Sequence, residues 1–135
     1  MAKKYGMAVD NLDNDETAVD ISMQLVAALQ LERSICVQLA DAATFDGYGN
    51  YDVVFLASLV GQTPAEKLAI IARIRDQLRP ESLLVARSAH HLRTLLYPEV
   101  DTESHGDLKL QVVIHPFNEV INSIVIFEKQ LETKS

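Results

Sequence analysis

An unbroken apolar run, Val53 to Ala57, lies within the stretch Tyr51–Gly61, which reads YDVVFLASLVG. A strand that is apolar on both faces must be covered on both faces, so the run predicts the centre of a parallel sheet sandwiched by helices. A buried helix segment would also be apolar throughout, but the short, β-branched run ending at Gly61 favours a strand. Ligands bind beyond the carboxyl ends of such strands, where Ser58 and Leu59 follow.

The part of the chain before this run predicts a strand, a helix and a second strand. The first strand covers Tyr5–Asn11, and Asp15 is placed to cap a helix over Glu16–Leu31. Strand Ser34–Leu39 follows, and then a loop over Ala42–Asn50. Residues at helical spacing predict one buried stripe on the helix, made of Ala18, Ile21, Leu25, Ala28 and Leu29.

After the central run, Thr63-Pro64-Ala65-Glu66 predicts a helix start, with a capping box between Thr63 and Glu66 and proline at the first helical position. The helix is expected to end at Arg79-Pro80. Its expected buried side is formed by Lys67, Ile70, Ile71, Ile74 and Leu78. Next come a strand over Ser82–Ala86, a short helix over Ala89–Leu96 and an acidic loop over Glu99–Asp107.

The last two strands, Leu108–His115 and Val120–Lys129, are joined by a short link and predict an antiparallel hairpin. The whole order predicts an α/β fold with a Rossmann-like, methyltransferase-type sheet that ends in this hairpin. We expect one domain over residues 1–135, and a partial one, because the first strand and the Gly-rich turn of that fold are missing from the pattern. The sheet should therefore have a gap in its middle or a changed strand order.

Composition narrows the possible partners. The chain has 19 acidic and 12 basic residues and a formal charge of −7, which argues against a nucleic-acid partner. Its single cysteine, Cys36, excludes an internal disulfide framework, fits a cytoplasmic location, and is expected to be a small buried residue. No apolar stretch approaches the ~20 residues that span a bilayer, and the first residues lack the apolar core of a signal peptide. We therefore expect no membrane partner.

Three segments together resemble the nicotianamine synthase family. They are YDVVFLASLVG, LLVARSAHHLRTLLYPEVD and the tail IHPFNEVINSIVIFEK, in which His-Pro, Glu-Val and Asn-Ser precede an apolar strand. LDNDETAVD is similar to the acidic turn of that family. The resemblance covers about Asn11 to Lys129, but only the later part of the family's length, and the RSAH and HPxxEVxNS motifs are its more specific elements.

The resemblance implies transfer of the aminocarboxypropyl group of S-adenosylmethionine to an amine acceptor, with release of methylthioadenosine, in the biosynthesis of a metal chelator. S-adenosylmethionine would be a substrate, and no metal cofactor is implied. Small molecules would then be the partners of this chain. The family's helical N-terminal region and Gly-rich turn have no counterpart in this sequence, so we expect this chain alone to bind S-adenosylmethionine weakly and not to turn it over.

Four residues are candidates for binding the nucleoside. Asp13 matches the first acidic residue of the family's turn and could accept hydrogen bonds from the ribose hydroxyls, or could instead help to cap the helix. Asp41 follows the second strand, where this fold places a polar group beside adenine; a solvated loop aspartate is the alternative. Ser58 and Leu59 are expected to flank the nucleoside or the sulfonium.

The remaining candidates follow the strand Ser82–Ala86. Arg87 ends this buried strand and needs an anion, either a substrate carboxylate or a structural acidic partner. Arg93 and Tyr97 share a helix face, and Tyr97 could orient the attacking amine or donate to a carboxylate, or simply pack with a wet hydroxyl. His90 is placed to hydrogen-bond in the pocket. His90 and His91 diverge on a helix and lack the supporting ligands of a metal site.

Two other functions remain open at this point. An ordinary S-adenosylmethionine-dependent methyltransferase would share the fold but release S-adenosylhomocysteine. A truncated, non-catalytic module would instead self-associate, as a homodimer, through exposed sheet edges.

Overall fold

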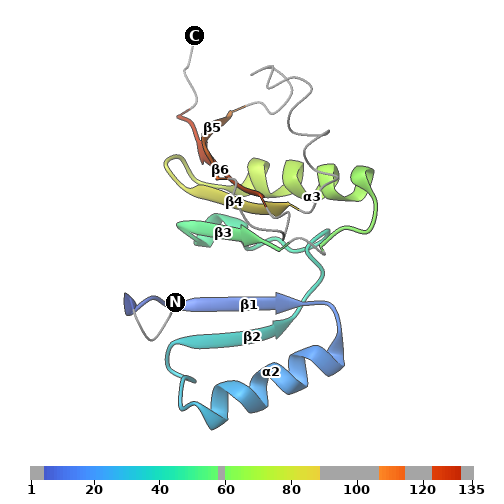
Figure 1. Cartoon of the computed structure of the whole chain (residues 1–135), viewed down its shortest axis with the longest axis vertical. Coiled ribbons are helices and arrows are strands. Elements are labelled where there is room, and N and C mark those ends of the chain that lie inside the picture. Colours follow the sequence, from blue (N-terminus) through green and yellow to red (C-terminus); the bar gives the residue numbers. More distant parts are fainter. Residues whose placement is uncertain (1–4, 58–59, 89–106, 115–122, 132–135) are drawn as a thin grey trace. The chain divides into compact units, whose positions relative to one another are not determined.

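The computed structural model describes residues 5–57, 60–88, 107–114 and 123–131 (Figure 1). The chain divides into two compact units, Met1–Phe45 and Asp46–Ser135. Each unit contains its own sheet, one of two strands and one of four. Within the described ranges, none of the helices is both long enough and apolar enough to cross a membrane.

The first unit is a parallel strand–helix–strand element. Strand β1 (Val9–Asp13) leads into helix α2 (Glu16–Ala28), and strand β2 (Ile35–Leu39) returns beside β1. The side chain of Asp15 accepts from the backbone N–H groups of Thr17 and Ala18, which confirms it as the helix cap. Both strands and the helix were expected from the sequence, although β1 begins at Val9 rather than at Tyr5.

The predicted buried stripe of α2 is wrong. Val19 is the buried residue of the helix, whereas Ile21, Leu25 and Leu29 are exposed by 60%, 58% and 56%. The helix carries apolar residues on more than one side, and the side that includes Val19 is the buried one. Periodicity alone selected the wrong face because the larger aliphatic side chains lie on the exposed side.

Cys36 also differs from expectation, because its side chain is exposed rather than buried. Side chains alternate between the two faces of a strand, and Val37 is the buried residue of β2. Cys36 and Gln38 therefore share the opposite face, where the Gln38 amide lies 3.8 Å from the Cys36 sulfur.

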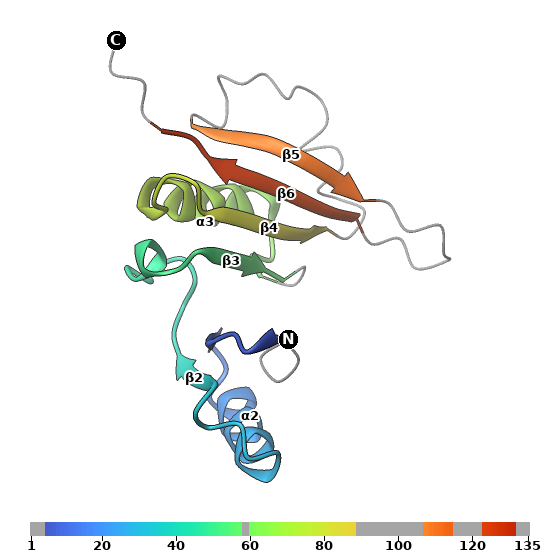
Figure 2. The same ribbon diagram turned by 90° about the vertical axis from the view of Figure 1, so that its left-hand side faces the viewer.

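The second unit is a four-stranded sheet with one described helix against it (Figure 2). Its sheet order is β3-β4-β6-β5, with β3 parallel to β4 and β6 antiparallel to both of its neighbours. The elements are η1 (Tyr48–Asn50), β3 (Val53–Leu56), α3 (Pro64–Gln77), β4 (Leu83–Ser88), β5 (Leu108–Ile114) and β6 (Ser123–Lys129). The predicted antiparallel end is confirmed, with β6 lying between β4 and β5.

Helix α3 begins as the sequence predicts. The Thr63 hydroxyl accepts from the Glu66 N–H at 3.2 Å, and the Glu66 carboxylate accepts from the Thr63 N–H at 3.1 Å. The predicted buried side is confirmed at Lys67, Ile70, Ile71, Ile74 and Leu78. The helix packs on one face of the sheet, and the largest fully buried side chains of this core are Ile74 and Leu84.

Strand β3 lies at one end of its sheet rather than at the centre, which corrects the expectation for the central run. Its apolar character on both faces is nevertheless real, since Leu56 is buried while Val53 and Phe55 are exposed. In the described residues each unit has its own sheet, and no strand pairs with β3 on the side away from β4.

One tight approach joins η1 to the end of α3. A Cβ atom added at Gly49 would lie 2.8 Å from the backbone oxygen of Gln77, so this position has no room for a side chain. The Gln77 side chain also accepts from the Tyr48 N–H at 3.1 Å, and Tyr48 is buried. The chain entering β3 is thereby held against the carboxyl end of α3.

Candidate functional site

Two aspartates lie at the carboxyl end of the β1–β2 pair. Asp13 is the last residue of β1 and pairs in register with Leu39, and Asp41 follows two residues beyond Leu39. The Ala40 N–H donates to the Asp13 carbonyl at 2.9 Å, so the pairing continues as far as the loop. The structure therefore brings these two predicted residues to the same sheet edge, as expected for parallel strands.

Asp13 and Asp15 have different local roles. The Asp15 N–H donates to the Asp13 side chain at 3.0 Å, whereas the Asp15 side chain accepts from Thr17 N–H at 2.8 Å and Ala18 N–H at 3.2 Å. Asp15 is thus the residue that accepts hydrogen bonds from the free backbone N–H groups at the start of α2. Asp13 braces the turn before the helix, and its carboxylate has further lone pairs for another donor.

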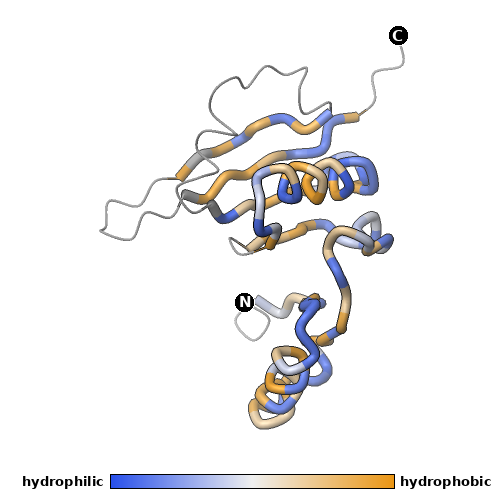
Figure 3. The backbone as a smooth tube through the Cα atoms, turned by 90° about the vertical axis from the view of Figure 1, so that its right-hand side faces the viewer, coloured by the Kyte–Doolittle hydropathy of each residue, from blue (hydrophilic) through white to orange (hydrophobic). Residues whose placement is uncertain are grey.

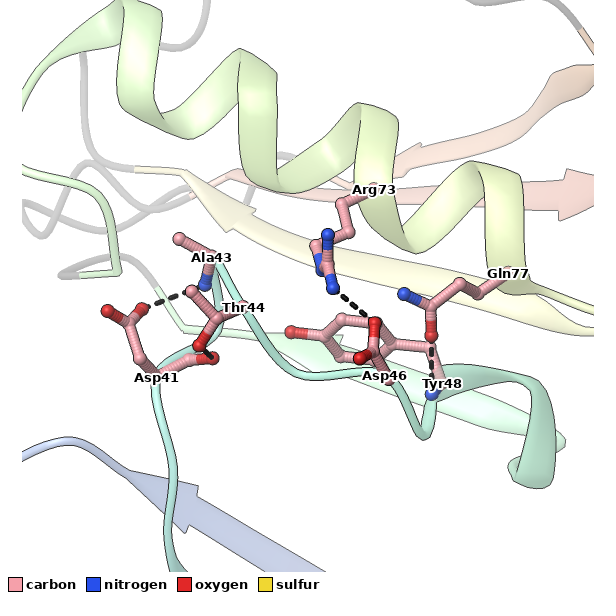
Figure 4. Close-up of polar contacts among 7 residues, drawn as sticks. All are labelled: Asp41, Ala43, Thr44, Asp46, Tyr48, Arg73 and Gln77. Atoms are coloured by element: carbon pink, nitrogen blue, oxygen red, sulfur yellow. Dashed lines mark hydrogen bonds and ion pairs between the residues drawn. The ribbon is translucent and has the colours of Figure 1, made fainter.

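Asp41 shapes the loop after β2. Its carboxylate accepts from the Ala43 N–H at 2.8 Å, and the Thr44 hydroxyl donates to its backbone carbonyl at 3.4 Å (Figure 4). This arrangement is a local side-chain turn, and the side chain is exposed. Two carboxylates at one sheet edge suit a ligand that presents hydroxyl and amino donors rather than phosphates.

In the second unit, the residues after this loop are tied to α3 by contacts that sequence reasoning missed. Arg73 forms an ion pair with Asp46, and Gln77 accepts from the Tyr48 N–H (Figure 4). Arg73 and Gln77 are four residues apart on the helix, so they share a face. That spacing was visible in the sequence, but nothing there identified Asp46 and Tyr48 as their partners.

Arg87 is exposed in the structure, whereas Leu84 and Ala86 of the same strand are buried. It pairs with Ile124 across the antiparallel β4–β6 ladder, near the carboxyl end of β4. The sequence argument assumed a buried guanidinium that required an anion, and the exposure of Arg87 removes that requirement. No ion pair joins Arg87 to an acidic residue of the described ranges.

The other predicted site residues fall outside the described residues. They are Ser58, Leu59, His90, Arg93 and Tyr97. Asp13 and Asp41 belong to one compact unit and Arg87 to the other.

The charges of the described part give little sign of metal chemistry. Among the residues that the structure describes, no group of three His, Cys, Asp or Glu side chains could hold a metal ion.

One titratable group of the described residues has a shifted pKa. Burial lowers the pKa of Lys67 below its usual 10.5. Lys67 lies on the buried side of α3, together with Ile70, Ile71 and Ile74.

The fold matches solved structures of S-adenosylmethionine-dependent enzymes. A crystal structure of MtNAS in complex with MTA and tNA aligns at a TM-score of 0.70 and 20% identity, over 96% of this chain and 47% of that chain. The apo methyltransferase SibL aligns at a TM-score of 0.74 and 16% identity, over 96% of this chain and 46% of that chain. The predicted Rossmann-like, methyltransferase-type fold is therefore confirmed.

Sequence relatives are more specific. The chain is 46% identical to Nicotianamine synthase 2 of Oryza sativa subsp. japonica over 93 residues, which is 67% of this chain and 28% of the relative. It is 36% identical to Nicotianamine synthase 1 of Arabidopsis thaliana over 121 residues, which is 88% of this chain and 38% of the relative. The chain thus spans less than two fifths of the length of these relatives.

The model of the family described as "Nicotianamine synthase protein" matches residues 2–134, almost the whole chain. This match agrees with both relatives and with the fold. The chain therefore belongs to the nicotianamine synthase family.

Proposed function

We propose that this chain takes part in transferring the aminocarboxypropyl group of S-adenosylmethionine to an amine acceptor, in nicotianamine-type biosynthesis. The observation that carries the proposal is the family match over residues 2–134. Support also comes from solved structures of MtNAS, one with MTA and tNA and an E81Q mutant with S-adenosylmethionine. The substrates are small molecules, and S-adenosylmethionine serves as the group donor rather than as a methyl donor.

The reaction makes defined demands on the protein. A neutral amine attacks the γ carbon of the aminocarboxypropyl arm, a carbon–nitrogen bond forms, and the carbon–sulfur bond breaks. The sulfonium leaves as neutral methylthioadenosine, and the amine loses one proton to a base. The protein must hold the sulfonium and the amine in line and bind the carboxylates of both reactants.

The carboxyl end of the β1–β2 pair is the proposed nucleoside subsite. Asp13 would accept from the ribose hydroxyls, and Asp41 would accept from the adenine amino group. Their common position at one sheet edge supports this assignment. Ser58 and Leu59 would flank the nucleoside or the sulfonium after β3.

Three cationic or hydrogen-bonding residues and one tyrosine complete the proposal. Arg87 and Arg93 would bind substrate carboxylates, for which a guanidinium offers paired donors. His90 would hydrogen-bond to substrate, and Tyr97 would orient the attacking amine. The exposure of Arg87 leaves its guanidinium accessible to a carboxylate.

Binding of S-adenosylmethionine tests the nucleoside subsite. We predict that Asp13→Asn weakens binding about tenfold, because an amide is a poorer acceptor for two hydroxyl donors than a carboxylate. Asp20→Asn, which makes the same change on an exposed part of α2, should leave the affinity unchanged. Isothermal titration of the purified variants measures both. Equal affinities for wild type and Asp13→Asn would remove Asp13 from the subsite.

Product analysis tests the reaction class. The chain is incubated with S-adenosylmethionine and candidate amines, and the nucleoside products are separated by mass. Methylthioadenosine supports aminocarboxypropyl transfer, whereas S-adenosylhomocysteine would overturn it in favour of an ordinary methyltransferase. Only the shared fold supports the methyltransferase alternative: the N-methyltransferase NodS has a similar fold, at a TM-score of 0.68 and 14% identity.

We expect the chain alone to bind weakly and to give no turnover, because it matches less than two fifths of the length of its relatives. Sub-micromolar affinity would refute this expectation. Release of methylthioadenosine by the pure chain would refute it too, while supporting aminocarboxypropyl transfer as the reaction class. The third possibility, a non-catalytic homodimer, is supported by the edge of β3 away from β4, where none of the described strands pairs. It would appear as a dimer in light scattering without any binding of S-adenosylmethionine. A cytoplasmic location remains part of the proposal and is testable by fractionation of the source cells.

A further inference from the structure

The connection from β2 to β3 contains an aspartate that is followed directly by glycine. Asp46-Gly47 is the single Asp-Gly pair of the sequence, which contains no Asn-Gly pair. Asp46 is also the first residue of the second unit, so the pair lies where the chain passes from one unit to the other. Figure 3 shows hydrophilic positions among hydrophobic ones along this connection, as expected of a surface loop.

The Asp46 carboxylate is open to solvent. Its side chain is 85% exposed and forms an ion pair with the guanidinium of Arg73 (Figure 4). An ion pair this exposed contributes little to stability, so it opens often and lets the aspartate side chain change rotamer. Arg73 therefore restrains the carboxylate without locking it in place.

The backbone nitrogen of Gly47 is also available. Among the residues that the structure describes, none accepts a hydrogen bond from the Gly47 N–H, whereas the next N–H group, that of Tyr48, donates to the Gln77 side chain at 3.1 Å. Gly47 has no Cβ atom to hinder an approach to its nitrogen. An exposed carboxyl carbon thus lies next to an unhindered backbone nitrogen, and a bond between the two would close a five-membered ring.

We propose that Asp46 is a site of spontaneous covalent modification, at which its peptide bond to Gly47 converts to an isoaspartyl bond. The carboxylate takes a proton from solvent, and the Gly47 nitrogen attacks the carboxyl carbon. A carbon–nitrogen bond forms, and the amide proton leaves with the carboxyl hydroxyl group as water. Water then adds to the main-chain carbonyl carbon of the ring, breaks its bond to the Gly47 nitrogen and leaves a carboxylate, which returns the proton. Water is lost once and gained once, so the mass of the chain is unchanged.

The conversion changes the backbone where the two units are joined. The main chain then runs through the side-chain carbons of Asp46 and becomes one atom longer. Downstream, the Tyr48 N–H is bonded to Gln77, and Gly49 has no room for a side chain against the same residue. The added atom is therefore accommodated on the side of Phe45, in the link to the first unit. The proposal goes beyond the transfer chemistry and does not depend on it.

Asp52 provides an internal comparison. Its side chain is also exposed, by 95%, and forms an ion pair with Arg79 at 2.9 Å. The residue after it is Val53, the first residue of β3, whose β-branched side chain hinders access to its nitrogen. The two aspartates thus share exposure and an arginine partner, and they differ in the residue that follows.

The test labels the ring carbonyls with heavy oxygen. The purified chain is kept folded at neutral pH in water enriched in heavy oxygen, digested with trypsin in ordinary water, and its peptides are fragmented by electron transfer. The tryptic peptide Ser34–Lys67 contains both aspartates, so they are compared in one molecule. We expect at least about tenfold more heavy oxygen at Asp46 than at Asp52, with fragments diagnostic of isoaspartate, because the glycine nitrogen is unhindered.

Matched variants separate the roles of the glycine and the arginine. Gly47 has φ −100° and ψ 7°, a conformation open to alanine, so Gly47→Ala should fold and should lower the labelling of Asp46 about tenfold. Arg73→Met should raise it about two- to fivefold, the range that an exposed ion pair provides. Arg79→Met makes the same change at the partner of Asp52 and should leave Asp46 unaffected. In urea, which removes the ion pair, wild type and Arg73→Met should be labelled equally.

The outcomes decide the proposal. Labelling of Asp46 no greater than that of Asp52, or equal in wild type and Gly47→Ala, would overturn it. Equal labelling of folded wild type and folded Arg73→Met would overturn the restraining role of Arg73. The comparison of the two aspartates uses the wild-type chain, so it stands even where a variant fails to fold. Binding of S-adenosylmethionine plays no part in the test, so failure here and failure of the nucleoside subsite are distinguishable.

Discussion

Lys67 places an amine on the buried side of α3. Burial disfavours the charged form and lowers the pKa of this amine from 10.5. The position of Lys67 on the buried side of the helix was predictable from the helical spacing, because it falls on the same side as Ile70, Ile71 and Ile74. The perturbation of its titration was not, because it depends on how closely the sheet packs against the helix.

We predict that the free energy of unfolding of wild type rises relative to that of Lys67→Met as the pH increases toward 10.5. Between the lowered folded pKa and 10.5 the unfolded chain binds more protons than the folded chain, so stability increases with pH in that window. Urea unfolding at a series of pH values measures the difference. The exposed pair wild type and Lys109→Met is the control, and a flat difference for Lys67 would contradict the prediction.

Substitutions at two glycines with positive φ distinguish the cost of backbone strain from the cost of a close contact. Gly61 has φ +78°, and a Cβ there would lie 3.0 Å from the backbone nitrogen of Lys67, whereas Gly6 has φ +65° and open space around it. We predict that Gly61→Ala costs about 1–3 kcal/mol of stability and Gly6→Ala only about 1 kcal/mol, because the first substitution adds a close contact to the strain. Thermal and urea unfolding check this. Equal losses would show that α3 shifts easily to accommodate the added methyl group.

At the scale of elements, local signals in the sequence predicted α3 well and α2 only in part. The capping box of Thr63 and Glu66 depends on residues close in sequence, and it forms as expected. The buried side of α2 depends on which face meets the β1–β2 pair, and Ile21, Leu25 and Leu29 proved to be exposed. Helical spacing predicts that a helix has an apolar side. It does not predict which of two apolar sides packs against the rest of the fold.

The capping box allows a quantitative test. We predict that Thr63→Ala lowers the free energy of unfolding by about 1 kcal/mol, because the Glu66 N–H loses its acceptor. Combined with Glu66→Ala, the loss should be smaller than the sum of the two single losses, since the two residues form one unit. Thr17→Ala, in the first turn of α2 but not at its cap, is the matched control and should cost less. Strict additivity would contradict reciprocal capping.

At the scale of the whole molecule, the two units have unequal cores. Val19 and Val37 are the buried apolar residues of the first unit, whereas the fully buried Ile74 and Leu84 both lie in the second. The sequence predicted the described strands and helices, but it could not show that the four-stranded sheet would hold nearly all of the buried core. Of the candidate site, it placed Asp13 and Asp41 at one strand edge and wrongly assumed that Arg87 was buried.

We predict that amides of β1, β2 and α2 exchange through openings of lower free energy than those of β4 and β6. The reason is that fewer buried side chains must be exposed to open the first unit. Native-state hydrogen exchange at increasing urea measures the opening free energies residue by residue. Equal values across both units would indicate one cooperative structure and would contradict the prediction.

The exposed thiol on β2 has a practical consequence. Cys36 is the single cysteine of the chain, and its side chain is exposed. A maleimide dye or a spin label attached there would sit on the strand pair that carries the two aspartates, without any engineered substitution. The same accessibility means that preparations kept in air should accumulate covalent dimers that a reductant dissolves, so association must be measured with that thiol kept reduced or blocked.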